Sequence, residues 1–232
     1  MPVYTQVTYL PILLQVSRGA IAHLSTYLEQ KNLLFKKVLI ISGKTFSSKI
    51  ATQVLEDPRL SPWKHITIES NSLVEVEQLR DLIYQNSIDL IIGIGGGKVI
   101  DVTKRLSLVQ RVNCIVVPTT ISNDGLISPI SVLRTPQGIT QSIAAQMPMG
   151  VVVDLNIVES APKRYLQAAA GDILSNLSAT HDWVLAQEQR GEQINDIAYQ
   201  MSIMSAYSSV NFYDVSLCVC DFLKQIVYAQ FN

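Results

Sequence analysis

The chain has 232 residues, of which 48% are hydrophobic and 16% are charged, and its formal net charge is −1. A chain of this length can bury a sizeable core, and the composition favours a globular protein that forms a homo-oligomer over a disordered one. Lysine and arginine do not cluster along the sequence, so the charge pattern gives little support for nucleic-acid binding.

Membrane and disulfide signals are both weak. The apolar stretch at residues 9–16 is interrupted by a proline and a glutamine, so it is too short to span a bilayer, and it lacks the basic flank of a signal peptide. The three cysteines, Cys114, Cys218 and Cys220, are too sparse for a disulfide framework, and the spacing of the last two is not a usual zinc pattern. These features predict a cytoplasmic protein without a membrane segment.

The first two-thirds of the chain alternates helix-like and strand-like segments. One apolar face marks helices at 21–28, 73–84 and 99–109, and short apolar runs mark strands at 37–42, 65–69, 88–94, 114–117 and 150–154. Strands that alternate with helices at this spacing predict right-handed crossovers and a mostly parallel sheet that is covered on both faces.

Two segments depart from this alternation. Residues 119–150 are rich in Ser, Thr, Asn, Gly and Pro around the apolar stretch 130–133, which indicates a long loop and a hairpin. Beyond Pro162, which fits the first position of a helix, the sequence is typical of helices to its end. We therefore expect an α/β, Rossmann-like domain with a mostly parallel sheet over 1–160, followed by an incomplete all-α domain over 161–232.

A glycine-rich turn joins the strand at 88–94 to the helix that follows it. Gly95, Gly96 and Gly97 allow backbone N–H groups to converge without Cβ atoms in the way, and the helix start adds unpaired donors and the positive end of its dipole. Lys98 adds a point charge. These features suit a pyrophosphate group, and the alternative is a tight turn that needs small residues for packing.

Two common nucleotide-binding fingerprints do not fit this turn. The third glycine of the Rossmann fingerprint would fall on Lys98, and no acidic residue lies between Asp101 and Asp124 to bind a ribose. The P-loop pattern fails because Val99 stands where that pattern requires Ser or Thr. The turn therefore indicates a phosphate-binding family with a different signature.

Three motifs together resemble one superfamily. The run GGGKVIDVTK at 95–104 resembles the signature of the dehydroquinate synthase-like superfamily, which includes the iron-containing alcohol dehydrogenases and metal-dependent polyol dehydrogenases. The runs VPTTISNDGLISP at 117–129 and GDILSN at 171–176, with Asp182-Trp183 beyond them, look like the glycerol-1-phosphate dehydrogenases, which set archaeal lipid stereochemistry. Glycerol dehydrogenase is the nearest alternative. The resemblance covers residues 18–186.

The resemblance implies roles for individual positions. The cofactor pyrophosphate would be held by Gly95, Gly96, Gly97, Lys98 and Val99. The nicotinamide and its ribose would be lined by Thr119, Thr120, Ser122 and Ser128. Asp124 would contact the substrate, and Asp172 would act in catalysis as the first metal ligand. Lys44 lies where the family binds the adenosine ribose and is compatible with a 2′-phosphate, so both NAD and NADP are expected cofactors.

These roles imply an NAD(P)-dependent, metal-assisted oxidoreductase. It would interconvert glycerol 1-phosphate and dihydroxyacetone phosphate, or act on a closely related phosphorylated polyol. Zinc or iron bound to the carbinol oxygen would lower its pKa and favour the alkoxide from which hydride leaves. Taken alone, Asp124 could instead organise a loop turn, and Asp172 could cap the next helix.

The sequence departs from the family where the metal site should be completed. In the family two later histidines join the aspartate, but the 60 residues after Asp172 (232 − 172) contain one histidine, His181, which points away from Asp172 on a helix. We therefore expect a helical domain that is truncated at the C-terminus. Four alternatives stay open: a shortened enzyme, a non-catalytic dinucleotide-binding or assembly protein, a chain completed by helices of another chain, and a carbocycle-forming synthase of the same superfamily.

Overall fold

A computed structural model describes residues 10–60 and 62–211. Contacts divide these residues into two compact units. The first, the α/β unit, consists of residues 11–121 and 125–161. The second, the helical unit, contains residues 10, 122–124 and 162–211 of the described chain.

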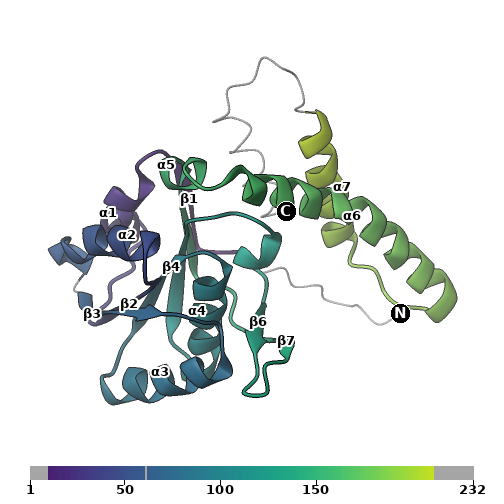
Figure 1. The fold of residues 1–232 in the computed structure, drawn as a ribbon. Helices are drawn as coiled ribbons and strands as arrows, with labels where there is room; N and C mark the ends of the chain where they lie inside the picture. Colours follow the sequence, from purple (N-terminus) through teal and green to yellow (C-terminus); the bar gives the residue numbers. More distant parts are fainter. Residues whose placement is uncertain (1–9, 61, 212–232) are drawn as a thin grey trace. The chain divides into compact units, whose positions relative to one another are not determined.

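The α/β unit is built on a six-stranded parallel sheet with the strand order β1-β8-β5-β4-β2-β3 (Figure 1). Its strands are β1 (Leu13–Ser17), β2 (Val38–Gly43), β3 (Pro62–Ile68), β4 (Leu90–Gly95), β5 (Asn113–Pro118) and β8 (Gly150–Asp154). The central strand β4 is buried along its whole length, as expected where helices cover both faces of a parallel sheet. The predicted sheet is confirmed.

Helices connect these strands and cover them. Those before residue 162 are η1 (Ala20–His23), α1 (Leu24–Gln30), α2 (Phe46–Leu55), η2 (Pro58–Leu60), α3 (Leu73–Gln85), α4 (Gly97–Gln110), η3 (Asp124–Leu126) and α5 (Leu155–Glu159). The predicted helices at 21–28, 73–84 and 99–109 correspond to η1 with α1, to α3 and to α4.

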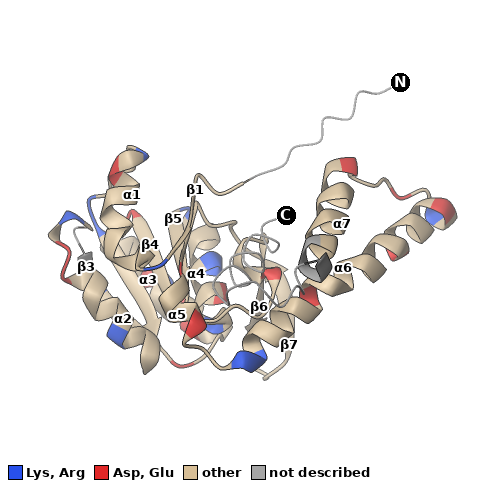
Figure 2. Cartoon of the chain, turned by 90° about the horizontal axis from the view of Figure 1, so that it is seen from above, with Lys and Arg blue, Asp and Glu red and all other residues tan. Residues whose placement is uncertain are grey.

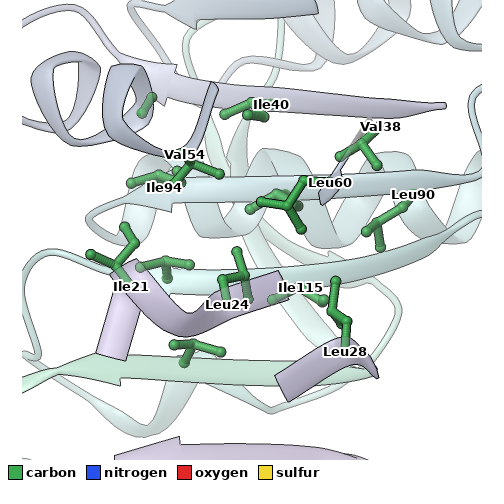
Figure 3. Close-up of a cluster of buried hydrophobic side chains, with 14 of the residues drawn as sticks. Ile21, Leu24, Leu28, Val38, Ile40, Val54, Leu60, Leu90, Ile94 and Ile115 are labelled. Atoms are coloured by element: carbon green, nitrogen blue, oxygen red, sulfur yellow. The ribbon is translucent and has the colours of Figure 1, made fainter. Parts of the chain in front are cut away.

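Each face of the sheet carries its own hydrophobic cluster. Side chains alternate along a strand, so neighbouring residues of β2 enter different clusters. Val38 and Ile40 pack with Leu24 and other residues of α1 and α2 (Figure 3), whereas Leu39 and Ile41 pack with residues of α3 and α4. The core therefore fixes α4, and the turn before it, against the centre of the sheet.

An antiparallel hairpin, separate from the six-stranded sheet, lies between β5 and β8 along the chain. Its strands are β6 (Ile130–Arg134) and β7 (Thr140–Ala144), and the hairpin agrees with the prediction around 130–133. Leu133 is fully buried in the cluster beneath α3 and α4, so the hairpin is attached to the same face of the sheet as α4.

The edge strand β1 was not predicted. It pairs with β8, which is close in space but distant in sequence. At the end of β8, the buried carboxylate of Asp154 accepts hydrogen bonds from the amides of Gly19 and Ile21 at 3.0 and 3.2 Å. Gly19 has a φ of 70°, a left-handed conformation that glycine adopts without strain. Asp154 thus holds the turn that leaves β1.

The helical unit contains α6 (Lys163–Arg190) and α7 (Asp196–Asn211). Both agree with the helical character predicted after residue 160. Pro162 is the N-cap of α6 rather than its first helical residue, so α6 begins one residue later than predicted, at Lys163. Within the described ranges, no helix has the length and hydropathy needed to cross a membrane. Cys218 and Cys220 lie outside the described residues.

Candidate functional site

The turn between β4 and α4 leaves two backbone donors ahead of the helix. β4 ends at Gly95, and Gly96 caps α4. The amides of Val99 and Ile100 donate to the Gly96 carbonyl at 3.0 and 3.2 Å. The amides of Gly97 and Lys98 lie before the first amide that donates a hydrogen bond within α4, and both residues are exposed. Two such amides at the positive end of a helix dipole form a site that favours an anion.

The glycines around this turn are required for different reasons. A Cβ atom at Gly93 would lie 2.3 Å from Thr103 Oγ1, and one at Gly95 would lie 2.5 Å from Val99 Cγ2. These two glycines allow α4 to pack closely against β4. At Gly97, by contrast, a Cβ atom would meet no described atom within 4 Å apart from the neighbouring residues and the backbone of α4. Tight packing explains Gly93 and Gly95, but it does not explain glycine at position 97.

Strand register brings the two threonines to the same turn. Gly95 of β4 is paired with Pro118 of β5, and the Thr119 amide donates to the Gly95 carbonyl at 2.9 Å. The Thr120 hydroxyl oxygen would lie 3.0 Å from a Cβ atom built on Gly96. A hydroxyl group therefore lines the glycine turn from the neighbouring strand end, where parallel sheets commonly bind ligands.

The segment between η3 and β6 is held by a buried lysine of α4. The Lys104 side chain is 0% exposed, and its Nζ donates to the carbonyls of Gly125 and Ile130 at 2.7 and 2.6 Å. It also lies 3.4 Å from the Ser128 hydroxyl, which donates to the Ile130 carbonyl at 3.3 Å. Ser128, predicted to contact the cofactor, is thus positioned by Lys104.

Sequence reasoning included Lys104 in a motif but gave it no role. A signal was present, because Lys104 shares a helical face with Ile100 and Ser107, both buried. A lysine on such a face needs oxygen partners from another part of the chain. Those partners come from residues 125–130, which the sequence shows only as a loop.

Asp101 lies one helical turn before Lys104 and also faces the hairpin. Burial raises the pKa of this carboxyl to about 6, and the positive charge of Lys104 and a hydrogen bond from the Val132 backbone partly oppose that rise. Above this pKa the Asp101 carboxylate carries a negative charge one helical turn from the buried ammonium of Lys104.

The helical unit contains the two aspartates predicted for substrate and metal. Asp172 lies inside α6, nine residues after Lys163 (172 − 163), so its interpretation as a helix cap is wrong. Its Oδ2 atom accepts a hydrogen bond of 2.9 Å from the Asp124 amide. The structure therefore brings the Asp124 backbone to the Asp172 carboxylate, although 48 residues separate them in the sequence (172 − 124). Ser122 belongs to the same unit.

A set of metal ligands does not form around Asp172 in the described part of the chain. No group of three or more His, Cys, Asp or Glu side chains there could hold an ion. His181 is exposed on α6, and its Nδ1 lies 2.7 Å from the Leu177 carbonyl of its own helix. This agrees with the prediction that His181 does not face Asp172.

An open pocket lies at the carboxyl ends of β2 and β3. It has a volume of about 530 Å³ and is lined by Lys44, Thr67, Glu69, Ser70, Ser72, Val74, Glu75 and Gln78. Lys44, predicted to suit a 2′-phosphate, forms an ion pair with Glu69. Because β2 is the neighbour of β4, the pocket opens one strand away from the glycine turn. Any phosphate bound by Lys44 would compete with this carboxylate.

Comparisons with known proteins agree with the family expected from the three motifs. Residues 15–162 match the model of a family described as iron-containing alcohol dehydrogenase. The curated glycerol-1-phosphate dehydrogenase of Saccharolobus islandicus, whose name includes NAD(P)+, is 32% identical over 207 residues, which are 89% of this chain and 58% of the relative. The enzyme of that name from Thermococcus sibiricus is 40% identical over 152 residues, 66% of this chain and 43% of the relative.

Solved structures share the fold. A probable glycerol dehydrogenase from Sinorhizobium meliloti matches with a TM-score of 0.78 and 21% identity, over 95% of this chain and 63% of that one. The glycerol dehydrogenase of Schizosaccharomyces pombe matches with a TM-score of 0.79 and 21% identity, over 97% of this chain and 60% of that one. This chain therefore spans less than two-thirds of the length of these curated relatives and solved structures.

Proposed function

This chain belongs to the iron-containing alcohol dehydrogenase family, and on that premise we propose that it binds NAD or NADP at the turn between β4 and α4. One observation carries the proposal: Gly97 faces open space beside two amides that precede the hydrogen bonds of α4. A pyrophosphate can approach such a backbone because no side chain stands in its way. Lys98 adds positive charge to the same turn.

We assign the cofactor contacts from the family resemblance, and the ends of β4 and β5 support the assignment for the residues that lie there. The pyrophosphate would be held by Gly95, Gly96, Gly97, Lys98 and Val99. The nicotinamide half would be lined by Thr119, Thr120, Ser122 and Ser128. Residues 1–160 would then form the nucleotide-binding domain, and residues 161–232 would contribute to the binding of substrate and metal.

The proposed substrate is a small phosphorylated polyol. Support comes from the curated relatives, which are named glycerol-1-phosphate dehydrogenases, so the reaction would interconvert glycerol 1-phosphate and dihydroxyacetone phosphate. A bound nicotinamide would supply or accept a hydride at the carbon that bears the reacting oxygen. The exposed Asp124 would accept a hydrogen bond from a substrate hydroxyl, while its own amide is fixed by the Asp172 carboxylate.

Asp172 is the position that the family resemblance assigns to zinc or iron. A catalytic zinc site normally has three protein ligands and one open position. The residues at 10–60 and 62–211 include no such group, so the described donor set does not fit the ion. We propose Asp172 as a ligand only in a site completed by further donors.

A turnover assay tests the proposed reaction. Reduction of dihydroxyacetone phosphate is followed by loss of absorbance of NADH or NADPH, with and without added Zn²⁺. We expect turnover with one or both cofactors, and we expect Asp124→Asn to reduce it at least tenfold. Glu188→Gln, which removes an exposed carboxylate of α6, should not change the rate. No turnover in any combination would refute the reaction for this chain.

A second candidate is a dinucleotide-binding protein without catalysis. It is favoured by one observation, the lack of a three-ligand cluster among the described residues. Calorimetry separates the two candidates: binding of NADH without turnover supports the second, and failure to bind any of the four nicotinamide dinucleotides removes it. A synthase-type reaction on a phosphorylated ligand would give products without a change in nicotinamide absorbance.

A further inference from the structure

Lys104 of α4 is fully buried, and its ammonium group is surrounded by oxygen atoms rather than by apolar side chains alone. The basic positions of α4 are marked in Figure 2. At 0% exposure, an ammonium group loses its hydration and must recover it from protein oxygens. The oxygens around Nζ include the carbonyls of Gly125 and Ile130, which accept its hydrogen bonds, and the hydroxyl of Ser128. The charge therefore organises one short segment of backbone.

The geometry closes that segment at both ends. Gly125 and Ile130 are five residues apart (130 − 125), yet both carbonyls point to the same nitrogen, at 2.7 and 2.6 Å. A second contact fixes the following strand to α4, because the Ser131 hydroxyl donates to the Asp101 carbonyl at 2.9 Å. Side-chain and backbone atoms of α4 thus hold the segment at Gly125, Ile130 and Ser131.

The same contacts determine what Ser128 can offer to a ligand. Its hydroxyl donates to the Ile130 carbonyl and faces the Nζ of Lys104, which can only donate. A hydroxyl oxygen has one proton and two lone pairs, so Ser128 retains one lone pair for a ligand. A ligand group that meets Ser128 must therefore be a donor, such as a ribose hydroxyl or a carboxamide NH₂ group.

We propose that Lys104 is a positioning residue for the nicotinamide half of the cofactor, and that it acts by orienting Ser128 as a hydrogen-bond acceptor. The inference rests on the proposed cofactor site. It makes a distinction within that site: the pyrophosphate would be held by the glycine turn, about two helical turns before Lys104 on α4, whereas the nicotinamide half would depend on residues 125–130. Loss of Lys104 should therefore affect the two halves of the cofactor unequally.

A comparison of NADH binding with ADP binding separates the contributions of the two halves of the cofactor. ADP carries the adenosine and pyrophosphate but lacks the nicotinamide half. We expect Lys104→Met to raise the Kd for NADH at least tenfold and to leave the Kd for ADP within twofold. Arg105→Met is the matched control, because Arg105 is the next residue on α4 and donates to the Ala144 carbonyl of β7. It should change neither Kd.

Circular dichroism and thermal unfolding establish that each variant is folded. If Lys104→Met does not fold, Ser128→Ala gives the same test at a half-buried position, and it should show the same unequal loss. Equal loss of NADH and ADP affinity would assign Lys104 a purely structural role and overturn the inference, as would unchanged affinity for both. Wild-type protein that binds neither NADH nor ADP would instead refute the proposed function.

Discussion

Replacing Gly97 with alanine separates two reasons for glycine in the turn between β4 and α4. Apart from the neighbouring residues and the backbone of α4, no described atom lies within 4 Å of the added Cβ. The residue also begins a helix, where alanine is favoured over glycine by up to about 1 kcal/mol. We therefore expect the melting temperature to stay the same or to rise by about 2–4 °C. A glycine required for packing would give the opposite result.

Cofactor binding should change in the other direction. The methyl group would occupy the space in which a pyrophosphate approaches the amides of Gly97 and Lys98. A hydrogen bond to a charged group contributes roughly 1.5–3 kcal/mol, so the loss of one corresponds to a rise of about 10- to 100-fold in Kd. Titration of NADH, followed by its fluorescence, measures this value in wild type and variant.

Two variants frame the result. Gly171→Ala places a methyl group in open space on α6 and should stabilise without changing the Kd for NADH. Gly93→Ala would place its Cβ 2.3 Å from Thr103 Oγ1 and should destabilise the protein by about 1–3 kcal/mol. Wild-type NADH affinity in Gly97→Ala, or a marked loss of its stability, would refute the reasoning.

Three further changes test other parts of the structure. The pKa of Asp101 is about 6 in the folded state rather than 3.8, so the folded state binds this proton more tightly than the unfolded state does. The free energy of unfolding should therefore fall by roughly 1–2 kcal/mol as the pH rises from about 4 to about 6. Asp101→Asn should remove this fall, which urea unfolding at both pH values measures. Asp154→Ala should lower the free energy of unfolding by about 2–4 kcal/mol, because it removes the acceptor for the Gly19 and Ile21 amides and the N-cap of α5. Asp154→Asn keeps an acceptor oxygen and should retain most of that free energy. An equal loss in both variants would contradict the role of Asp154 as an acceptor. Glu69→Gln should release Lys44 from its ion pair and raise the affinity for NADPH relative to NADH by about fivefold, or roughly 1 kcal/mol. Competitive titrations of the two cofactors measure this ratio. An unchanged ratio would exclude the pocket beside Lys44 as the site of the 2′-phosphate.

The sheet could be predicted because its central strands are short, continuous apolar runs. β4 and β5 are buried on both faces, so their sequence alone marks them. β1 was missed because only its partner β8, more than a hundred residues away, makes it a strand. α2 was missed because its first turn is Phe-Ser-Ser-Lys, which obscures the apolar face formed by Ile50, Ala51 and Val54.

The candidate site was predictable only in part. The glycine turn follows from sequence because a strand, three glycines and a helix are contiguous. The packing roles of Gly93 and Gly95 depend on Thr103 and Val99, whose contacts appear only after α4 has docked on β4. The role of Lys104 depends on a loop whose conformation no local pattern specifies. Long-range contacts thus decide which residues of a motif bind and which ones pack.

Amide chemical shifts test the central claim most directly. In a ¹H–¹⁵N titration of the wild-type chain with NADH, the signals of Gly97 and Lys98 should show the largest shifts among the backbone amides, with smaller shifts at Thr119 and Thr120. The Gly97→Ala variant should reach the same shifts only at a much higher NADH concentration. Saturating NADH that leaves the Gly97 and Lys98 amides unmoved, or that shifts only amides of α6 and α7, would contradict the account.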